Sequence, residues 1–263
     1  MMKFIENDCD KSVAHKALEL RYELQKVFKQ IDESSLDILI SSLTEYNPYL
    51  STDQFYAWVD SLKEKTVFKV KKIPLKQIKR WYFDINGNFR HESGRFFSIE
   101  GLKVQTNTGI VKEWKQPIIY QPEIGILGIL CQKHDGILYF LLQAKIEPGN
   151  INVIQMSPTV QATKSNYSQV HGGKLPPYLD YFINIDNNKI IVDQLQSEQG
   201  SRFYKKRNRN IIIEIPPAEA INILENYCWL TLGQIKRLLT QNNIINMDTR
   251  SVLACTQIKK TSS

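Results

Sequence analysis

The chain has 263 residues, of which 42% are hydrophobic and 23% are charged, and its formal net charge is +7. This is the composition of a globular protein with room for one large domain or two small ones, and no apolar run reaches the ~18 residues of a membrane span. The first residues, MMKFIENDCDKS, lack the apolar stretch of a signal peptide, so we expect a cytoplasmic protein that binds no membrane.

Helices are expected at the amino-terminal end. Apolar residues recur three and four positions apart over residues 11–31, as in an amphipathic helix. Two further segments, 34–43 and 51–65, begin with residues that commonly cap helices. We interpret residues 1–64 as an N-terminal helical arm and residues 65–263 as a second module.

Strand patterns begin at residue 66. The strongest signal is a hairpin over residues 124–146, in which two apolar strands flank an Asp-Gly turn. Continuous apolarity on both strands predicts a sheet covered on both faces. Partial alternation with β-branched and aromatic residues predicts further strands in residues 66–75, 79–84, 96–106, 115–121, 189–196 and 210–216.

Helices are expected again near the end, in residues 216–227, 231–242 and 248–260. The sequence therefore predicts an α+β fold: a helical arm, then a mixed or largely antiparallel sheet flanked by helices.

Most motifs of known chemistry are missing. There is no GxGxxG, GxxxxGK[ST], HExxH or GxSxG, and the four histidines are too scattered to suggest a metal cluster. The four cysteines form no CxxC pair, so we expect free and mostly buried thiols. We expect neither a metal nor a redox cofactor.

Residues 143–173 form a long segment of short polar side chains. Asn, Gln, Ser and Thr supply neutral hydrogen-bond donors and acceptors, which suit sugar hydroxyls, a base edge and a pyrophosphate. A nucleotide sugar presents all three. Cations for its phosphates follow in the basic run 202–210.

Several blocks of the sequence resemble the nucleotide-hexose 2,3-dehydratases of deoxysugar biosynthesis. The blocks occur in the order of that family and span about residues 80 to 255. They read HESGRFFSIEGL, KQPIIYQPEIGILGIL, FLLQAKIEPGNINVIQMSPTVQATKSNYSQVHGG, LQSEQGSRFYKKRNRNIIIEI, WLTLGQIKRLL and NMDTRSVLAC.

The resemblance implies a Nudix-hydrolase-like fold, although the Nudix box itself is absent. It implies removal of water across C2 and C3 of a substrate such as dTDP-4-keto-6-deoxyglucose, with no cofactor, to give a 3,4-diketo-2,6-dideoxy sugar nucleotide. Family members are about twice as long and carry two such modules in tandem, whereas this chain has one. A homodimer could then replace the duplication, and a downstream 3-ketoreductase could trap the diketone.

The reaction needs a base at C3, a donor at the C4 oxygen and an acid at the C2 hydroxyl. Glu147 is the expected carboxylate, with pairing to Lys145 as its alternative role. His91 is an alternative base, although a lone histidine is more often structural. Tyr167 is the expected acid or enolate donor, and His171 is a weaker candidate.

The remaining candidates would bind the substrate. Trp81 is expected to stack on the base, with core packing as the alternative. Residues 199–202 are expected to grip a phosphate, and Arg207 and Arg209 either reinforce that site or brace acidic neighbours such as Asp248. The full set of expected binding residues is Trp81, Lys145, Gln161, Ala162, Thr163, Asn166, Gln199, Gly200, Ser201, Arg202, Arg207 and Arg209.

Two other functions fit the sequence less well. A nucleic-acid binding module would suit the basic runs, but no RNP-like or helix-turn-helix signature is present, so we expect no nucleic-acid partner. A non-catalytic nucleotide-sugar binding module is the main alternative, because one copy of a duplicated enzyme module can be inactive.

Overall fold

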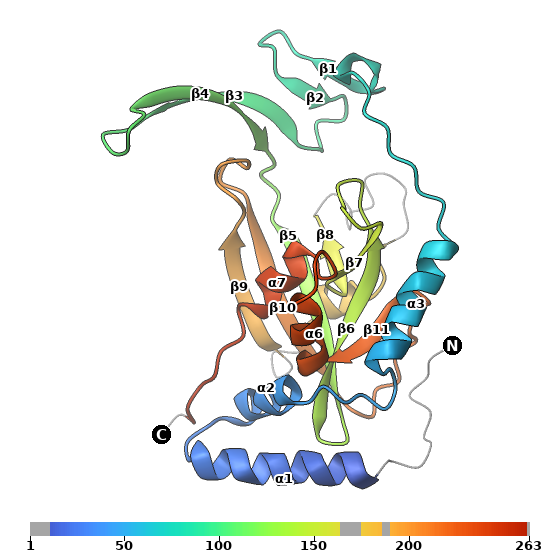
Figure 1. Cartoon of the computed structure of the whole chain (residues 1–263). Coiled ribbons are helices and arrows are strands. Elements are labelled where there is room, and N and C mark those ends of the chain that lie inside the picture. The colour runs from blue at the N-terminus through green and yellow to red at the C-terminus, as the bar shows by residue number, and fades with distance from the viewer. Residues whose placement is uncertain (1–10, 164–174, 186–189, 262–263) are drawn as a thin grey trace.

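The computed structural model describes residues 11–163, 175–185 and 190–261. Within them the chain forms two sheets, and helices pack around the larger one, which we call the main sheet (Figure 1). Its strand order is β11-β6-β5-β10-β9, with β7 beside β6 and β8 beside β5. The strands are β5 (Gly125–His134), β6 (Ile137–Ile146), β7 (Ile154–Ser157), β8 (Val160–Ala162), β9 (Ile190–Ser197), β10 (Arg207–Ile215) and β11 (Tyr227–Thr231).

The main sheet is mixed. Strand β10 runs parallel to β5, whereas the other pairs in this sheet are antiparallel. The predicted α+β class, with a mixed sheet flanked by helices, is confirmed.

The predicted hairpin is formed by β5 and β6. They pair up to His134 and Ile137, and Asp135 and Gly136 between them have φ of +50° and +78°. Positive φ at both central positions is the geometry of a type I′ turn, which Asp-Gly pairs favour. Because the turn sets the register, it also sets which side chains reach the far end of β6, where Lys145 lies.

Helices cover both faces of the hairpin, which explains its continuous apolar sequence. Alternate residues of β5 enter different hydrophobic clusters: Ile129 and Cys131 enter one, and Leu130 enters the other. The first cluster includes α3 (Thr52–Glu64), α6 (Leu232–Leu239) and α7 (Met247–Leu253), the second includes α1 (Lys11–Val27) and α5 (Asp180–Ile183), and α2 (Glu33–Leu43) contributes to both. The expected two-sided burial is confirmed, and Cys131 and Cys228 are buried free thiols.

Three helices, α1 to α3, occupy the amino-terminal part of the described chain, as predicted. Ser51 caps α3 through its side chain. The buried carboxylate of Asp37 in α2 forms ion pairs with Arg21 of α1 and Lys133 of β5. These pairs hold α1 and α2 against the main sheet. The division into an arm ending at residue 64 and a following module stays a prediction.

A smaller sheet of order β1-β2-β3-β4 stands at one end of the molecule (Figure 1). Its strands are β1 (Trp81–Phe83), β2 (Phe89–His91), β3 (Ser98–Gln105) and β4 (Glu113–Tyr120). The connection between β9 and β10 attaches β4 to the main sheet: the Ile119 N–H donates to the Arg202 carbonyl over 2.8 Å, and the Tyr204 N–H donates to the Ile119 carbonyl over 2.9 Å.

Two predicted elements are wrong. Residues 66–75 form no strand, and a 3₁₀ turn (Leu75–Gln77) begins at the last of them. Val67 in this segment is 90% exposed. The alternating pattern predicted a strand here, but no strand among the described residues pairs with this segment. Residues 216–226 form a loop in place of a helix, and Tyr227 begins strand β11. The Gln132 side chain donates to the carbonyls of Pro216 and Glu219, and Tyr178 bonds to the backbone further along, so side chains satisfy this backbone.

Short strands were the elements that pattern reading missed. β7 and β8 lie inside the polar segment, where apolar alternation is weak, and β11 begins in the segment predicted as helical. Among the helices of residues 11–163, 175–185 and 190–261, none combines the length and the apolarity that a bilayer span requires.

Candidate functional site

A cavity of about 250 Å³, which we call the polar cavity, lies where the start of β5, the end of β6, β8 and the start of β10 meet. Elements distant in sequence contribute to it, including α7 and the residue that follows β9. Its walls are formed by Gln121, Gly125, Leu127, Lys145, Gln161, Ala162, Thr163, Glu198, Phe203, Lys206, Asn208 and Asp248.

Strand pairing brings the cavity walls together. Parallel pairing of β10 with β5 places Asn208 opposite Gly125, and antiparallel pairing of β8 with β5 places Gln161 opposite Leu127. Successive side chains on a strand point to opposite faces. The cavity therefore receives the side chain of Asn208 from β10.

Lys145 and Gln161 form a hydrogen-bonded group with Glu147 at one wall. Lys145 Nζ donates to Gln161 Oε1 over 2.6 Å and lies 3.3 Å from Glu147 Oε1. Gln161 Nε2 donates to the same Glu147 oxygen over 3.3 Å. The three side chains hold one another in place, with the Lys145 ammonium at the cavity surface.

Glu198 and Asn208 form another part of the wall. The Asn208 side chain is buried and donates from Nδ2 to Glu198 Oε1. Gly125 permits this arrangement, because a Cβ atom at that position would lie 2.7 Å from Asn208 Oδ1.

Asp248 supplies a third carboxylate from the first turn of α7. Burial raises the pKa of its carboxyl to about 6, and the charges of Glu198 and Glu147 act in the same direction. Lys145 and a hydrogen bond with Gln161 lower the pKa by smaller amounts. Asp248 thus changes its protonation state closer to neutral pH than an ordinary aspartate does.

Lys206 is the most buried cation of the cavity, at 5% exposure. Its Nζ donates to the backbone carbonyl of Glu123. Burial lowers the pKa of Lys206, and the charges of Glu123 and Glu198 oppose this shift. A compact ammonium at this position can contact an anionic group inside the cavity.

The structure brings together part of the predicted binding set. Lys145, Gln161, Ala162 and Thr163 line the polar cavity, and Glu147 adjoins it through its contacts with Lys145 and Gln161. The pairing of Glu147 with Lys145, which the sequence left open, is present. A catalytic role for Glu147 stays a prediction.

Arg207 and Arg209 are not among the residues that line the polar cavity. They alternate along β10 with the cavity residue Asn208, so their side chains point to the face of the main sheet opposite to that of Asn208. Arg209 forms two hydrogen bonds with the carboxylate of Asp193 on β9, over 2.7 and 2.6 Å. The acidic neighbour of Arg209 is therefore Asp193.

The predicted phosphate-gripping residues, 199–202, lie in the connection between β9 and β10. The Ser201 carbonyl accepts from Gln116 Nε2 over 2.9 Å, and the Arg202 carbonyl accepts from Ile119. The backbone of this connection thus anchors β4. The side chains of Gln199 and Arg202 are exposed, and a role in phosphate binding stays a prediction.

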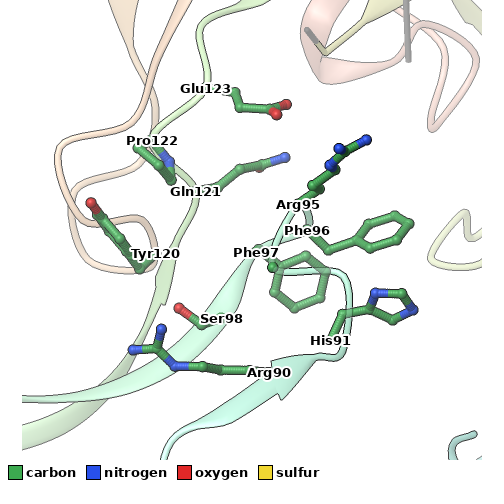
Figure 2. Close-up of a pocket in the computed structure, with 11 residues that line it drawn as sticks. Arg90, His91, Arg95, Phe96, Phe97, Ser98, Tyr120, Gln121, Pro122 and Glu123 are labelled. Carbon is green, nitrogen blue, oxygen red and sulfur yellow. The ribbon is translucent and has the colours of Figure 1, made fainter. Parts of the chain in front are cut away.

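Trp81 and His91 lie in the small sheet, outside the walls of the polar cavity. The Trp81 ring stacks on Phe89 with centroids 5.3 Å apart and contacts His91 edge-on at 5.4 Å. His91 is buried, and its Nδ1 lies 2.8 Å from Ser93 Oγ. His91 also lines a second pocket, of about 140 Å³, drawn in Figure 2. Base stacking by Trp81 and proton transfer by His91 stay predictions.

Three candidates lie outside the described residues: Tyr167, Asn166 and His171. The structure therefore leaves their expected roles as predictions.

Sequence reasoning missed Glu198, Asn208 and Asp248 as site residues. Asp248 lies in the block NMDTRSVLAC, and Glu198 and Asn208 lie in LQSEQGSRFYKKRNRNIIIEI. Both blocks carry the family resemblance, and a carboxylate or amide side chain inside such a block was the available signal. The burial that changes the chemistry of Asp248 depends on the tertiary fold.

The polar cavity can bind a polar ligand and move a proton. It combines amide side chains, two ammonium groups and carboxylates, one of which has a pKa raised by burial. Among the described residues, no group of three or more His, Cys, Asp or Glu side chains is arranged to hold a metal ion.

The sequence matches a known enzyme family. Residues 52–256 match the family described as NDP-hexose 2,3-dehydratase. A dTDP-4-dehydro-6-deoxy-alpha-D-glucopyranose 2,3-dehydratase of Saccharopolyspora spinosa is 50% identical over 216 residues, covering 82% of this chain and 44% of the relative. An enzyme of the same name from Amycolatopsis orientalis is 46% identical over 224 residues, covering 83% of this chain and 47% of the relative. The chain spans about half the length of these relatives.

Solved structures resemble the chain only weakly. The C-terminal domain of mouse MUTYH, in a complex with human PCNA, aligns with 54% of this chain at a TM-score of 0.34 and 12% identity. The C. elegans Ap4A hydrolase aligns with 51% at a TM-score of 0.31 and 12% identity. Likeness at this level carries no argument about activity.

Proposed function

Because the chain belongs to the NDP-hexose 2,3-dehydratase family, we propose that it removes water across C2 and C3 of a dTDP-4-keto-6-deoxyhexose. The product is the 3,4-diketo-2,6-dideoxy sugar nucleotide, an intermediate of deoxysugar biosynthesis. The names of the relatives supply the substrate class, and each relative is about twice as long as this chain.

The observation that carries the proposal is Asp248 in the wall of the polar cavity. Its carboxyl lies among Glu198, Glu147 and Lys145, and its pKa is raised by burial to about 6. A general base works best when its pKa lies near the working pH. Asp248 meets this condition, and neighbouring amides can bind sugar hydroxyls.

The reaction follows from the C4 ketone, which makes the C3 proton acidic. Asp248 takes that proton, and the electron pair moves onto the C4 oxygen as an enolate. The enolate then re-forms the ketone while the C2–O bond breaks, and protonated Asp248 returns the proton to the departing hydroxyl, which leaves as water. The resulting 2,3-enol tautomerises to the diketone, with a solvent proton added at C2.

Lys145 is the proposed donor to the C4 oxygen. Gln161 and Glu147 hold its ammonium at the cavity surface, and a fixed donor at a developing enolate contributes on the order of 3 kcal/mol. In this scheme Glu147 positions Lys145, whereas Asp248 transfers the proton. Tyr167 remains a predicted second donor or acid.

The proposed partners follow from the reaction and from the length of the relatives. A 3-ketoreductase acting downstream would consume the reactive diketone. Two copies of this chain would form a C2 pair that reproduces the two halves of a relative, since C2 pairs are the commonest homo-oligomers. Light scattering tests the second point: a fully active monomer would show that the pairing is wrong.

The activity can be tested by incubation with dTDP-4-keto-6-deoxyglucose, a 3-ketoreductase and NADPH. Loss of water followed by reduction gives a product lighter than the substrate by one oxygen atom, which mass spectrometry detects. If dTDP binds but no such product forms, the chain is a non-catalytic nucleotide-sugar binding module.

A further inference from the structure

The second pocket, which we call the aromatic pocket, adjoins the polar cavity. It lies between the β2–β3 turn, with Arg95, Phe96 and Phe97, and the segment that leaves β4. Gln121 in that segment lines both cavities, so the two spaces share this residue. Figure 2 shows Gln121 extending toward the side of the pocket that carries these three residues.

Arg95 carries an exposed guanidinium at this pocket. No residue in the described part of the chain forms an ion pair with it, whereas the neighbouring Arg90 pairs with Asp84 and Glu100 over 2.9 and 3.0 Å. A guanidinium whose five donors are free of carboxylates suits bidentate binding of a phosphate.

Phe96 and Phe97 form an aromatic wall supported from behind. Phe96 is 42% exposed, and its ring contacts His91 edge-on at 4.5 Å between centroids. The Phe97 ring lies 5.0 Å from Trp81. Because Trp81 and His91 hold these rings in place, the wall is preorganised for a planar ligand. This arrangement gives His91 and Trp81 a supporting role.

The glutamate in the pocket wall does not prevent anion binding. Glu123 lies beside Lys206, whose Nζ donates to the Glu123 carbonyl and whose charge interacts with that carboxylate. Lys206 also lines the polar cavity. Each of the two adjoining spaces therefore has a cation in its wall, Arg95 in the aromatic pocket and Lys206 in the polar cavity.

We propose that the aromatic pocket holds the nucleoside diphosphate of the substrate, with the base against Phe96 and Phe97 and the diphosphate between Arg95 and Lys206. The hexose then passes Gln121 into the polar cavity and meets Lys145 and Asp248. This inference rests on the proposed function, but it concerns binding of the nucleotide and can be tested without turnover.

Calorimetric titration with dTDP and with thymidine tests the assignment. Arg95→Ala and Arg95→Gln are expected to weaken dTDP binding at least about tenfold and to leave thymidine binding nearly unchanged, since a charged hydrogen bond to phosphate is lost. Phe96→Ala is expected to weaken both ligands at least about fivefold through lost stacking. Arg237→Ala, which removes an exposed arginine paired with Glu45, and Phe83→Ala, which removes an exposed ring on β1, are the matched controls.

Two results would overturn the assignment: unchanged dTDP affinity in the Arg95 and Phe96 variants, or no dTDP binding by the unaltered chain. Failure of the dehydratase reaction alone would not contradict the assignment of the nucleotide to the aromatic pocket. The dTDP affinity and its loss in the variants are measured without the hexose. If the enzyme is active and the Arg95 and Phe96 variants bind dTDP with unchanged affinity, the aromatic pocket does not bind the nucleotide, but the proposed function is not contradicted.

Discussion

Gly125 and Asn208 face each other across the parallel pair β5 and β10, and a Cβ atom on Gly125 would lie 2.7 Å from Asn208 Oδ1. Gly125→Ala is therefore expected to displace the Asn208 side chain and break its hydrogen bond to Glu198. Misplacement of one wall of a catalytic cavity lowers kcat/KM, here by about tenfold or more.

The matched control is Gly101→Ala on β3, where an added Cβ atom meets no atom within 4 Å. Steady-state kinetics of both variants measures the effect. Equal loss of activity in the two variants, or none in Gly125→Ala, would contradict the role given to Asn208.

Asp248→Asn is expected to lower kcat at least about a hundredfold, because the amide cannot accept the C3 proton. The variant should still bind dTDP. Glu147→Gln should have a smaller effect, since Glu147 acts by holding Lys145.

Asp60→Asn, at an exposed pair with Lys63, is the control. If Glu147→Gln were inactive and Asp248→Asn nearly normal, the proton carrier would be Glu147, as the sequence alone indicates.

The pH profile provides an independent test of Asp248. A base must be deprotonated in the free enzyme, and burial raises the pKa of this carboxyl to about 6. We expect kcat/KM to fall below about pH 6, about tenfold for each further pH unit. A profile that stays flat to about pH 4.5 would point to a group with an ordinary carboxyl pKa of about 4.

The same carboxyl also changes stability. Its pKa is raised in the folded state, so the folded chain binds more protons than the unfolded chain between the ordinary value of 3.8 and about 6. The free energy of unfolding therefore falls as pH rises through this window. Asp248→Asn removes the cost of the buried charge and should be more stable than the unaltered chain above about pH 7, by up to about 2 kcal/mol after allowance for partial exposure.

Thermal melts at about pH 7.5 and about pH 4 measure this difference. The melting temperature of Asp248→Asn should exceed that of the unaltered chain at the higher pH, and the two melting temperatures should be similar at the lower pH. A variant that is less stable at both values would show that the charged carboxylate stabilises the fold.

The elements that the sequence predicted well are those whose signals are local. The β5–β6 hairpin carries two apolar runs around an Asp-Gly turn, and α3 begins at the capping residue Ser51. The loop over residues 216–226 was mispredicted as a helix because its backbone bonds to Gln132 and Tyr178, which lie far away in the sequence.

The site was predicted in part for the same reason. Lys145 and Gln161 lie in a polar segment whose composition indicates ligand binding, so they could be found. The contacts that matter for Asp248 come from Glu198, Glu147 and burial, which only the folded chain supplies. The opposite orientation of Arg209 follows from the register of β10, which no local pattern reveals.

The most direct test of the account uses dTDP-4-keto-6-deoxyglucose that carries deuterium at C3, with mass spectrometry of the product. The account predicts loss of this deuterium with the departing water, a slower reaction than with unlabelled substrate, and a rate at least about a hundredfold lower with Asp248→Asn. Equal rates with the labelled and the unlabelled substrate, or normal turnover by Asp248→Asn, would contradict it.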